Sequence, residues 1–159
     1  MSDPGRGLAV RPGNPAPDFT LPSTGGGTVT LSQHRGAQNV LLAFFPLAFT
    51  RVCTAELCAF TEDFDRFASA TTQVYGVSVD SAPTLNAFRR EHKIGVDLLS
   101  DFRRDVCRRY GTLLEEEFFS RRAYVLVDRA GTVRWAFAEA QLGDRRENAE
   151  LLARVRELE

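Results

Sequence analysis

The feature that most constrains the fold is an apolar run at residues 39–45, which reads NVLLAFF. A strand that is apolar on both faces is typical of the centre of a sheet whose two faces are covered. A loop follows it, and a helix is expected from about Cys53 to Ala68, where apolar residues recur at helical spacing (Leu57, Phe60, Phe64 and Phe67). This succession predicts an α/β layer architecture with the strand near its centre.

Strands and helices also alternate in the rest of the chain. The predicted elements are a hairpin of residues 18–21 and 28–31, a strand at 74–79, a helix beginning at Ser81, a short helix at 105–110 closed by Gly111, a hairpin of 123–127 and 132–137, and a last amphipathic helix at 145–158. This order predicts a thioredoxin-like topology, with a central mixed sheet, helices on both faces and an added N-terminal β-hairpin. Periodicity alone also allows other three-layer α/β arrangements.

Length and composition set limits on domain organisation and partners. A chain of 159 residues with 43% hydrophobic residues predicts one domain spanning residues 1–159, of which residues 1–13, rich in Gly and Pro, are expected to be a loose tail. The formal net charge of −1 gives no electrostatic reason to expect a nucleic acid as partner. The longest apolar run, residues 40–49, is too short to span a bilayer, so no membrane partner is expected. The N-terminus lacks the apolar stretch of a signal peptide, which leads us to expect a cytoplasmic protein.

Cys53 lies where the apolar strand has ended and the long helix begins. Reactive groups of open α/β folds gather at the carboxyl ends of strands, and the unpaired N–H groups of a helix start favour an anion. A free thiol is only about 3% ionised at neutral pH, whereas a thiol at a helix start beside an arginine can be largely thiolate. Position alone equally allows Cys53 to be a buried core cysteine.

Two residues ahead of Cys53 favour the reactive interpretation. The hydroxyl of Thr50 can hydrogen-bond the sulfur or an incoming oxygen, and Pro46 fixes the backbone and shields the site from water. The pattern Pro46-Leu-Ala-Phe-Thr50-Arg-Val-Cys53 resembles the signature of the peroxiredoxin family. Further segments resemble that family along most of the chain: GNPAPDFTL at 13–21, LLSD at 98–101, VCRRYG at 106–111 and RRAYVLVDRAGTVRW at 121–135.

The resemblance extends to two subgroups, the one-cysteine alkyl hydroperoxide reductase E type, which has a similar FFPLAFT segment, and the bacterioferritin-comigratory or Q type, which has Cys-x4-Cys. It implies a thiol-dependent peroxidase that reduces hydrogen peroxide and organic hydroperoxides, with Cys53 passing through a sulfenic acid. It also implies that Arg122, rather than Arg121, is the active-site arginine, because Arg122 stands two residues before the apolar run YVLVD. Glu56 could orient that arginine, or it could be only a favourable carboxylate near the helix start.

Cys58 lies five positions after Cys53, which is the spacing of the resolving cysteine in many Q-type members. In an intact helix the two Cα atoms would lie about 8–9 Å apart on different faces, whereas a disulfide needs them within about 7 Å. An intramolecular Cys53–Cys58 disulfide therefore requires the first helical turns to unfold. The alternative is that Cys58 is a small core residue in a one-cysteine enzyme recycled by an external thiol. Cys107, between Val106 and Tyr110, is expected to be packed.

Other proteins of this fold class would carry different motifs. A thioredoxin-type disulfide oxidoreductase would need Cys-x2-Cys and a proline just before the C-terminal hairpin, but the last proline is Pro83. A copper chaperone would need Cys-x3-Cys with a downstream His, whereas the spacing here is Cys-x4-Cys. A zinc site is also not expected, because His34 and His92 are the only histidines and too few ligands are available. No metal and no cofactor are therefore expected.

The resemblance also bears on partners. It implies a hydroperoxide as substrate and a thiol as reductant, such as thioredoxin, a glutaredoxin-type protein or a low-molecular-weight thiol. The one-cysteine relatives imply a homodimer, whereas Q-type relatives are often monomers. A non-enzymatic role as a thiol redox sensor or chaperone stays open, and peroxide turnover with a recycling thiol would distinguish it.

Overall fold

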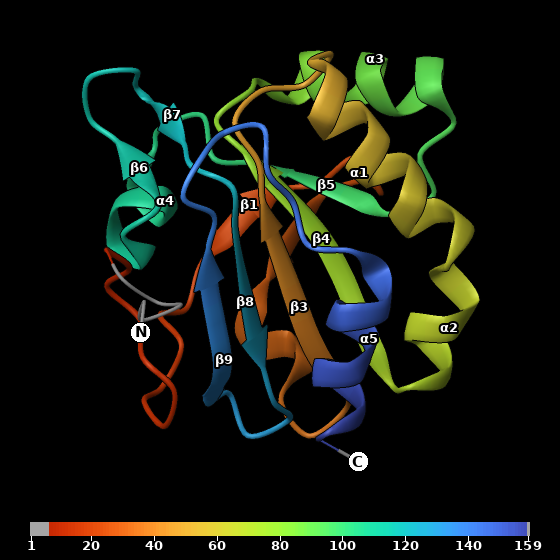
Figure 1. The fold of residues 1–159 in the computed structure, drawn as a ribbon, viewed down its shortest axis with the longest axis vertical. Helices are drawn as coiled ribbons and strands as arrows, with labels where there is room; N and C mark the ends of the chain where they lie inside the picture. Colours follow the sequence, from red (N-terminus) through yellow and green to blue (C-terminus); the bar gives the residue numbers. More distant parts are fainter. Residues whose placement is uncertain (1–6, 159) are drawn as a thin grey trace.

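One five-stranded sheet organises the structure, a computed structural model that describes residues 7–158. Its strand order is β5-β4-β3-β8-β9 (Figure 1). The strands are β3 (Asn39–Phe44), β4 (Thr72–Ser78), β5 (Asp97–Ser100), β8 (Ala123–Val127) and β9 (Val133–Ala138). β3 pairs in parallel with β4 and antiparallel with β8, while β4 and β5 are parallel and β8 and β9 antiparallel. The sheet is therefore mixed, as predicted.

The central position of β3 follows from its apolar sequence. All of its residues are buried. Because side chains alternate across a strand, Leu42 and Phe44 pack into one core cluster and Leu41 and Ala43 into another. Both faces of the sheet are thus covered, which confirms the prediction from the unbroken apolar run.

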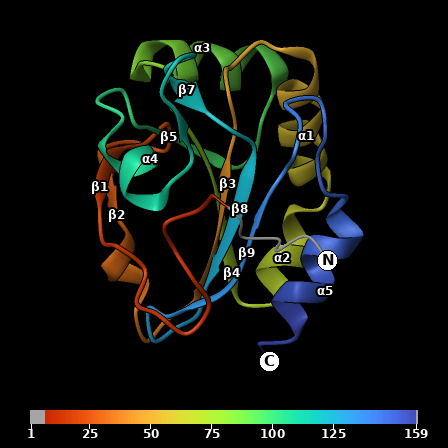
Figure 2. The same cartoon turned by 60° about the vertical axis from the view of Figure 1, so that its left-hand side comes forward.

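Four helices cover one face of the sheet (Figures 1 and 2). They are α1 (Arg51–Glu62), α2 (Phe64–Ser69), α3 (Ala82–His92) and α5 (Asn148–Arg156). α1, α3 and α5 each contribute a buried apolar stripe, for example Leu57 and Phe60 of α1 and Leu151 and Leu152 of α5, and α2 adds Phe67. Burial of these stripes stabilises the layer, because helical stability in proteins comes mostly from packing of the apolar face.

The opposite face is covered by α4 (Asp105–Tyr110) and by the N-terminal hairpin of β1 (Thr20–Pro22) and β2 (Thr28–Thr30), which leads into the 3₁₀ helix η1 (Leu31–His34). A small antiparallel pair, β6 (Leu113–Leu114) and β7 (Phe119–Ser120), follows α4. Figure 2 shows the hairpin and α4 on one side of the sheet and α1, α2 and α5 on the other. The thioredoxin-like arrangement with helices on both faces and an added hairpin is confirmed.

Two helix ends form for the reasons that the sequence suggests. Ser81 caps α3, since its hydroxyl accepts a hydrogen bond from the Thr84 backbone N–H at 3.3 Å. α4 ends at Gly111, whose φ of +77° is accessible to glycine at low cost. A side chain there would also collide with the backbone of Ala9, which donates its N–H to the Tyr110 carbonyl at 3.0 Å.

The N-terminal segment differs from the prediction. Leu8 and Val10 are each only 4% exposed and belong to the core cluster under α4. The Gly13 N–H donates to the Val133 carbonyl at 2.8 Å, which ties the segment to β9. The expectation of a loose tail is therefore wrong for residues 7–13, because burial of two apolar side chains outweighs the conformational freedom of the surrounding glycines. Residues 1–6 lie outside the described residues.

Two further differences concern element boundaries. The helix expected from Cys53 to Ala68 is two helices, α1 and α2, which meet at Asp63. Asp is unfavourable in helix interiors, and the Asp63 carboxylate instead accepts a hydrogen bond from Asn148 of α5 at 2.9 Å. The short strand β5 was not predicted, because a run of four residues carries too little periodicity to be recognised.

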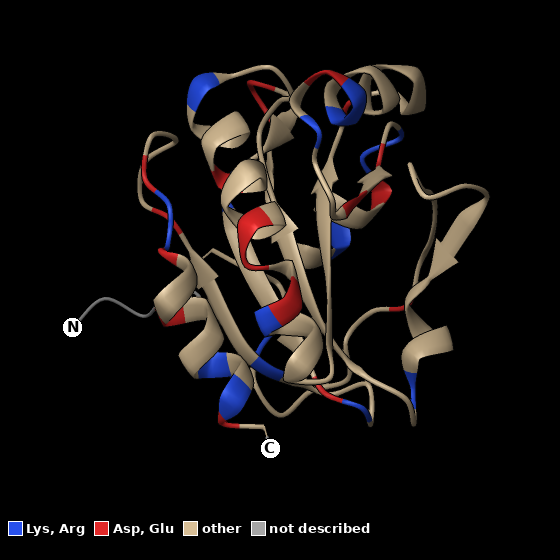
Figure 3. Cartoon of the chain, turned by 90° about the vertical axis from the view of Figure 1, so that its right-hand side faces the viewer, with Lys and Arg blue, Asp and Glu red and all other residues tan. Residues whose placement is uncertain are grey.

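Charged residues of both signs are interspersed over α1, α2 and α5 on the helical face (Figure 3). Examples are the ion pairs of Arg66 with Asp63 and of Arg146 with Glu150. Within residues 7–158, no helix combines the length and the apolar character needed to cross a membrane.

Candidate active site

A loop at the carboxyl end of β3 places the first turn of α1 against the sheet. Phe49 of this loop adopts φ +65°, a left-handed conformation that is costly for a bulky residue. Its ring packs against Phe88 of α3 at 5.0 Å between centroids. The Ala48 N–H donates to the Asp80 carboxylate at 2.8 Å, which ties the loop to the end of β4. These contacts hold the strained turn that starts the helix.

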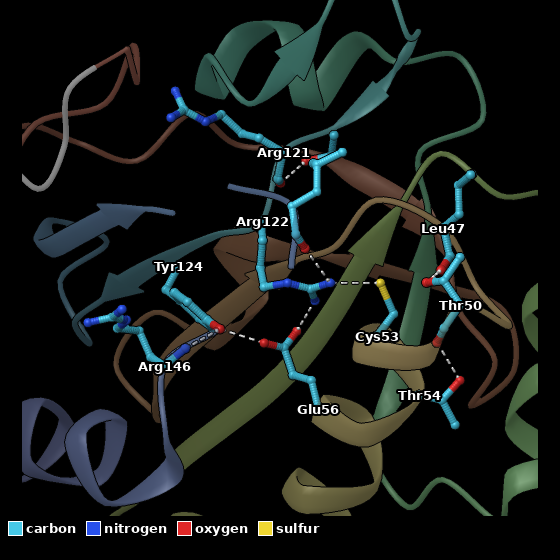
Figure 4. A network of polar contacts seen from close by, with 11 residues as sticks. Leu47, Thr50, Cys53, Thr54, Glu56, Arg121, Arg122, Tyr124 and Arg146 are labelled. Carbon is cyan, nitrogen blue, oxygen red and sulfur yellow. Dashed lines mark hydrogen bonds and ion pairs between the residues drawn. The ribbon is translucent and has the colours of Figure 1, made fainter. Parts of the chain in front are cut away.

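Cys53 is the third residue of α1 and is 1% exposed. Its sulfur accepts a hydrogen bond from Nη2 of Arg122 at 3.0 Å (Figure 4). The N–H groups of a first helical turn have no partner within the helix. Cys53 is therefore buried, as a core cysteine would be, but it is paired with a guanidinium and lies at a helix start, which is the environment of a reactive thiolate.

Arg122 joins Cys53 to a carboxylate on the same helix. Its Nη1 donates to Oε1 of Glu56 at 3.0 Å, and both side chains are 1% exposed. Oε2 of Glu56 accepts a hydrogen bond from the hydroxyl of Tyr124. Figure 4 shows these four side chains as one continuous chain of contacts between α1 and β8. Arg122 also reaches the Leu142 carbonyl with a longer bond of 3.5 Å.

The charge states of this buried pair are set by opposing effects. Burial lowers the pKa of Arg122, but the neighbouring Glu56 and Cys53 outweigh burial and raise it, so the guanidinium stays charged. Burial raises the pKa of Glu56 above its usual value, and the charge of Arg122 and the hydrogen bond from Tyr124 oppose that rise. The Glu56 carboxylate therefore depends on its two partners to stay ionised.

Thr50 and Pro46 lie at the mouth of the site. Thr50 has extended backbone angles and precedes α1, and its hydroxyl donates to the Leu47 carbonyl at 2.7 Å. Pro46 is buried. Together with Cys53 and Arg122 they line a cavity of about 310 Å³, whose other walls are Leu47, Arg51, Val52, Phe119, Leu142 and Gly143. The cavity gives a small molecule access to the sulfur past a mainly apolar wall.

The other two cysteines lie away from this cavity. Cys58 is half-buried, and its sulfur lies 4.0 Å from the His92 carbonyl at the end of α3, not against Cys53. Cys107 of α4 is fully buried, and burial together with Asp101 raises the pKa of its thiol far above the usual range. All three cysteines are free thiols.

Arg121 points away from Cys53, as Figure 4 shows. It is half-buried, and its Nη2 donates to the Glu139 carbonyl at 3.3 Å. The structure therefore places Arg122, and not Arg121, at the sulfur.

Two partners of the site were missed by the sequence analysis. Tyr124 was counted only as part of an apolar strand, although residues two apart on a strand share a face, so the position of Arg122 could have indicated it. The Leu142 carbonyl is a backbone group in a segment without a motif, and no sequence signal marks it. Among the described residues, no group of His, Cys, Asp and Glu side chains could hold a metal ion.

Comparison with known proteins agrees with this geometry. Residues 12–136 match the model of the AhpC/TSA family. Alkyl hydroperoxide reductase E of Mycobacterium tuberculosis is 38% identical over 126 residues, which cover 78% of this chain and 82% of that protein. The reduced 2-Cys peroxiredoxin of Plasmodium vivax superimposes with a TM-score of 0.85 at 32% identity, covering 90% of this chain and 79% of that one.

A further solved structure, peroxidoxin BcpB of Mycobacterium tuberculosis, superimposes with a TM-score of 0.83 at 26% identity, covering 94% of this chain and 99% of that one. The family model spans the loop, α1 and β8, and so includes every side chain of the network around Cys53. The chain belongs to the AhpC/TSA family and is a peroxiredoxin.

Proposed function

We propose that this peroxiredoxin reduces hydrogen peroxide and organic hydroperoxides with Cys53 as the nucleophile. The observation that carries the proposal is the bond from Arg122 to the Cys53 sulfur at 3.0 Å, at the floor of an accessible cavity. In the reaction the Cys53 thiolate attacks the terminal oxygen of the peroxide. The S–O bond forms as the O–O bond breaks, the sulfur becomes a sulfenic acid, and the leaving alkoxide or hydroxide takes up a proton.

The residues around the sulfur can stabilise the developing charge. Because the Thr50 hydroxyl donates its proton to the Leu47 carbonyl, its oxygen is left to accept the O–H of the peroxide. Arg122 presents several donors in one plane and stays charged, so it can bind sulfur and peroxide oxygen together. Preorganised donors in a buried site act more strongly than they would in water.

Turnover with a recycling thiol tests this function. We expect the wild-type protein to consume hydrogen peroxide and an organic hydroperoxide such as cumene hydroperoxide catalytically when dithiothreitol or thioredoxin with its reductase is present. Cys107→Ser is the matched control and should turn over at nearly the wild-type rate. A protein that reacts once and is never recycled would instead be a thiol redox sensor or chaperone, and the proposed enzyme function would be wrong.

We propose further that Cys58 resolves the sulfenic acid by forming an intramolecular disulfide. The two sulfurs face different partners, Arg122 and the His92 carbonyl, so α1 must unwind around residues 53–58 before they can meet. This segment lies at the start of a helix, and its opening must release the buried bonds of Cys53 and Glu56 to Arg122. Condensation of Cys58 with the sulfenic acid releases water, and two thiol groups of the reductant then restore both cysteines.

Replacement of Cys58 tests the resolving step. Cys58→Ser should reduce the first equivalent of peroxide as fast as the wild type and then accumulate sulfenic acid that is open to over-oxidation. The oxidised wild type should lose two hydrogen atoms in mass, form no intermolecular crosslink, and exchange the amides of residues 53–58 faster than the reduced form. If Cys58→Ser turns over normally with an external thiol and the wild type forms no internal disulfide, the enzyme is of the one-cysteine kind.

We propose that a thiol recycles the enzyme and that two copies of the chain form a homodimer. An open cavity mouth suits thioredoxin, a glutaredoxin-type protein or a low-molecular-weight thiol. Phe49 and Leu142, which are 45% and 44% exposed, leave apolar surface beside the site that a homodimer would cover.

A further inference from the structure

Tyr124 extends the site by one residue beyond the sulfur, the arginine and the carboxylate. It lies on β8 two residues after Arg122, so both side chains project from the same face of the sheet toward α1. Its side chain is fully buried. Its hydroxyl donates to Oε2 of Glu56 and accepts the backbone N–H of Arg146 at 3.0 Å.

The two bonds on Glu56 fix its carboxylate in one orientation. Oε1 accepts from Arg122 and Oε2 from Tyr124, so both oxygens are occupied. Arg122 in turn has few other constraints: its Nε has no hydrogen-bond partner among the described residues, and its bond to the Leu142 carbonyl is 3.5 Å long. The direction of the Arg122 guanidinium therefore depends on the carboxylate that Tyr124 holds.

We propose that Tyr124 is a positioning residue for peroxide reduction, which fixes the Glu56 carboxylate so that Arg122 stays aimed at Cys53 and the incoming peroxide. Tyr124 has no hydrogen bond to Cys53 and acts on Arg122 through Glu56. The inference rests on the proposed peroxidase function. It adds to that function a residue that affects the rate without contacting the reacting atoms.

The proposal has a characteristic pH dependence. The groups that face Glu56 are Arg122 just before β8, Tyr124 on β8, and Arg145 on the segment before α5, and Cys53 on α1 is bonded to the same guanidinium. Burial raises the pKa of Glu56, and the Tyr124 hydroxyl lowers it, so removal of that hydroxyl should raise the pKa further. A carboxyl group with a raised pKa becomes neutral as the pH falls. Neutral Glu56 no longer holds the charged Arg122, so the loss of rate should grow toward acidic pH.

The test compares Tyr124→Phe with Tyr110→Phe. Tyr110 is also fully buried, and its hydroxyl donates to the Pro17 carbonyl at 2.6 Å in the other core cluster. Both variants lose a buried hydroxyl, and Tm is expected to fall more for Tyr124→Phe, because its hydroxyl makes two hydrogen bonds, one of them to a carboxylate. The readout is the rate at which Cys53 is oxidised in a single turnover by excess hydrogen peroxide, measured from acidic to alkaline pH.

We expect Tyr124→Phe to oxidise more slowly than the wild type at acidic pH, by about tenfold, with the loss shrinking as the pH rises and Glu56 ionises. Tyr110→Phe should match the wild type throughout. Equal rates for the two variants, or a loss from Tyr124→Phe that is uniform across pH, would overturn the proposal in favour of a purely structural role. A faster reaction of Tyr124→Phe at acidic pH would also overturn it, because relief of the repulsion between Glu56 and the thiolate would then outweigh positioning.

A second variant protects the test against a folding defect in Tyr124→Phe. Site-specific replacement of Tyr124 by 3-fluorotyrosine keeps the ring and the hydroxyl but makes the hydroxyl a stronger donor. The acidic limb of the rate profile should then move to lower pH, and an unchanged limb would count against the proposal. If the wild type itself shows no oxidation of Cys53, it is the peroxidase function that fails, and the two failures are thereby distinguished.

Discussion

Replacement of Cys53 by serine is expected to lower the rate of peroxide consumption to less than a few per cent of the wild-type rate. A serine hydroxyl stays protonated at neutral pH and is a poor nucleophile, so neither the helix start nor Arg122 can activate it to a comparable extent. Cys53 is 1% exposed but lines a cavity of about 310 Å³, so a hydroperoxide can reach the sulfur through that cavity. The measurement is the initial rate of peroxide loss with saturating recycling thiol.

Cys107→Ser is the control for this result. In the wild type the Cys107 thiol is fully buried away from the cavity, and burial together with Asp101 keeps this thiol protonated by raising its pKa. Thermal unfolding of both variants separates loss of chemistry from loss of fold. A Cys53→Ser protein that folds and keeps more than a few per cent of the activity would show that another cysteine is the nucleophile.

Replacement of Arg122 by lysine is expected to slow the oxidation of Cys53 about tenfold or more. The guanidinium bonds Glu56 with Nη1 and Cys53 with Nη2, and a single ammonium group on a flexible stem cannot reproduce these two directed bonds. Lysine keeps the positive charge, so Glu56 is not left as a buried charge without a partner, which would itself cost about 3–5 kcal/mol. The effect on the rate is therefore separable from a gross effect on stability.

Arg121→Lys is the matched control, because Arg121 is adjacent in sequence but points away from the sulfur (Figure 4). It should lose much less rate than Arg122→Lys in a single-turnover assay of Cys53 oxidation. Similar losses for the two variants would mean that the guanidinium beside Cys53 contributes no more than a positive charge near the start of β8.

The central part of the fold could be predicted because its signals are local. The apolar run of β3, the glycine that closes α4 and the serine that caps α3 each act within a few residues. The errors arose where contacts distant in sequence decide the outcome. Leu8 and Val10 are buried only because α4 and the sheet offer them a surface, and Asp63 breaks the long helix where Asn148 binds its carboxylate.

In the site, too, the residues marked by local spacing could be predicted, and the contacts between distant positions could not. The motif residues Pro46, Thr50 and Cys53 lie within one loop and one helical turn, and their spacing was visible in the sequence. The link from Glu56 to Tyr124 joins positions 68 residues apart and involves a tyrosine on an otherwise apolar strand. A buried tyrosine in such a strand indicates core packing until its hydroxyl partner is seen.

The most direct test of the account is the mass of the reduced protein after one equivalent of hydrogen peroxide, followed by peptide mapping. We expect Cys53 to be oxidised in every modified molecule, either as a sulfenic acid that carries one additional oxygen atom or, after resolution, in a disulfide with Cys58 that has lost two hydrogen atoms. Cys107 should remain a free thiol. Oxidation that is spread over the three cysteines, or that is found at Cys58 or Cys107 while Cys53 stays reduced, would contradict the assignment of Cys53 as the peroxide-reactive residue.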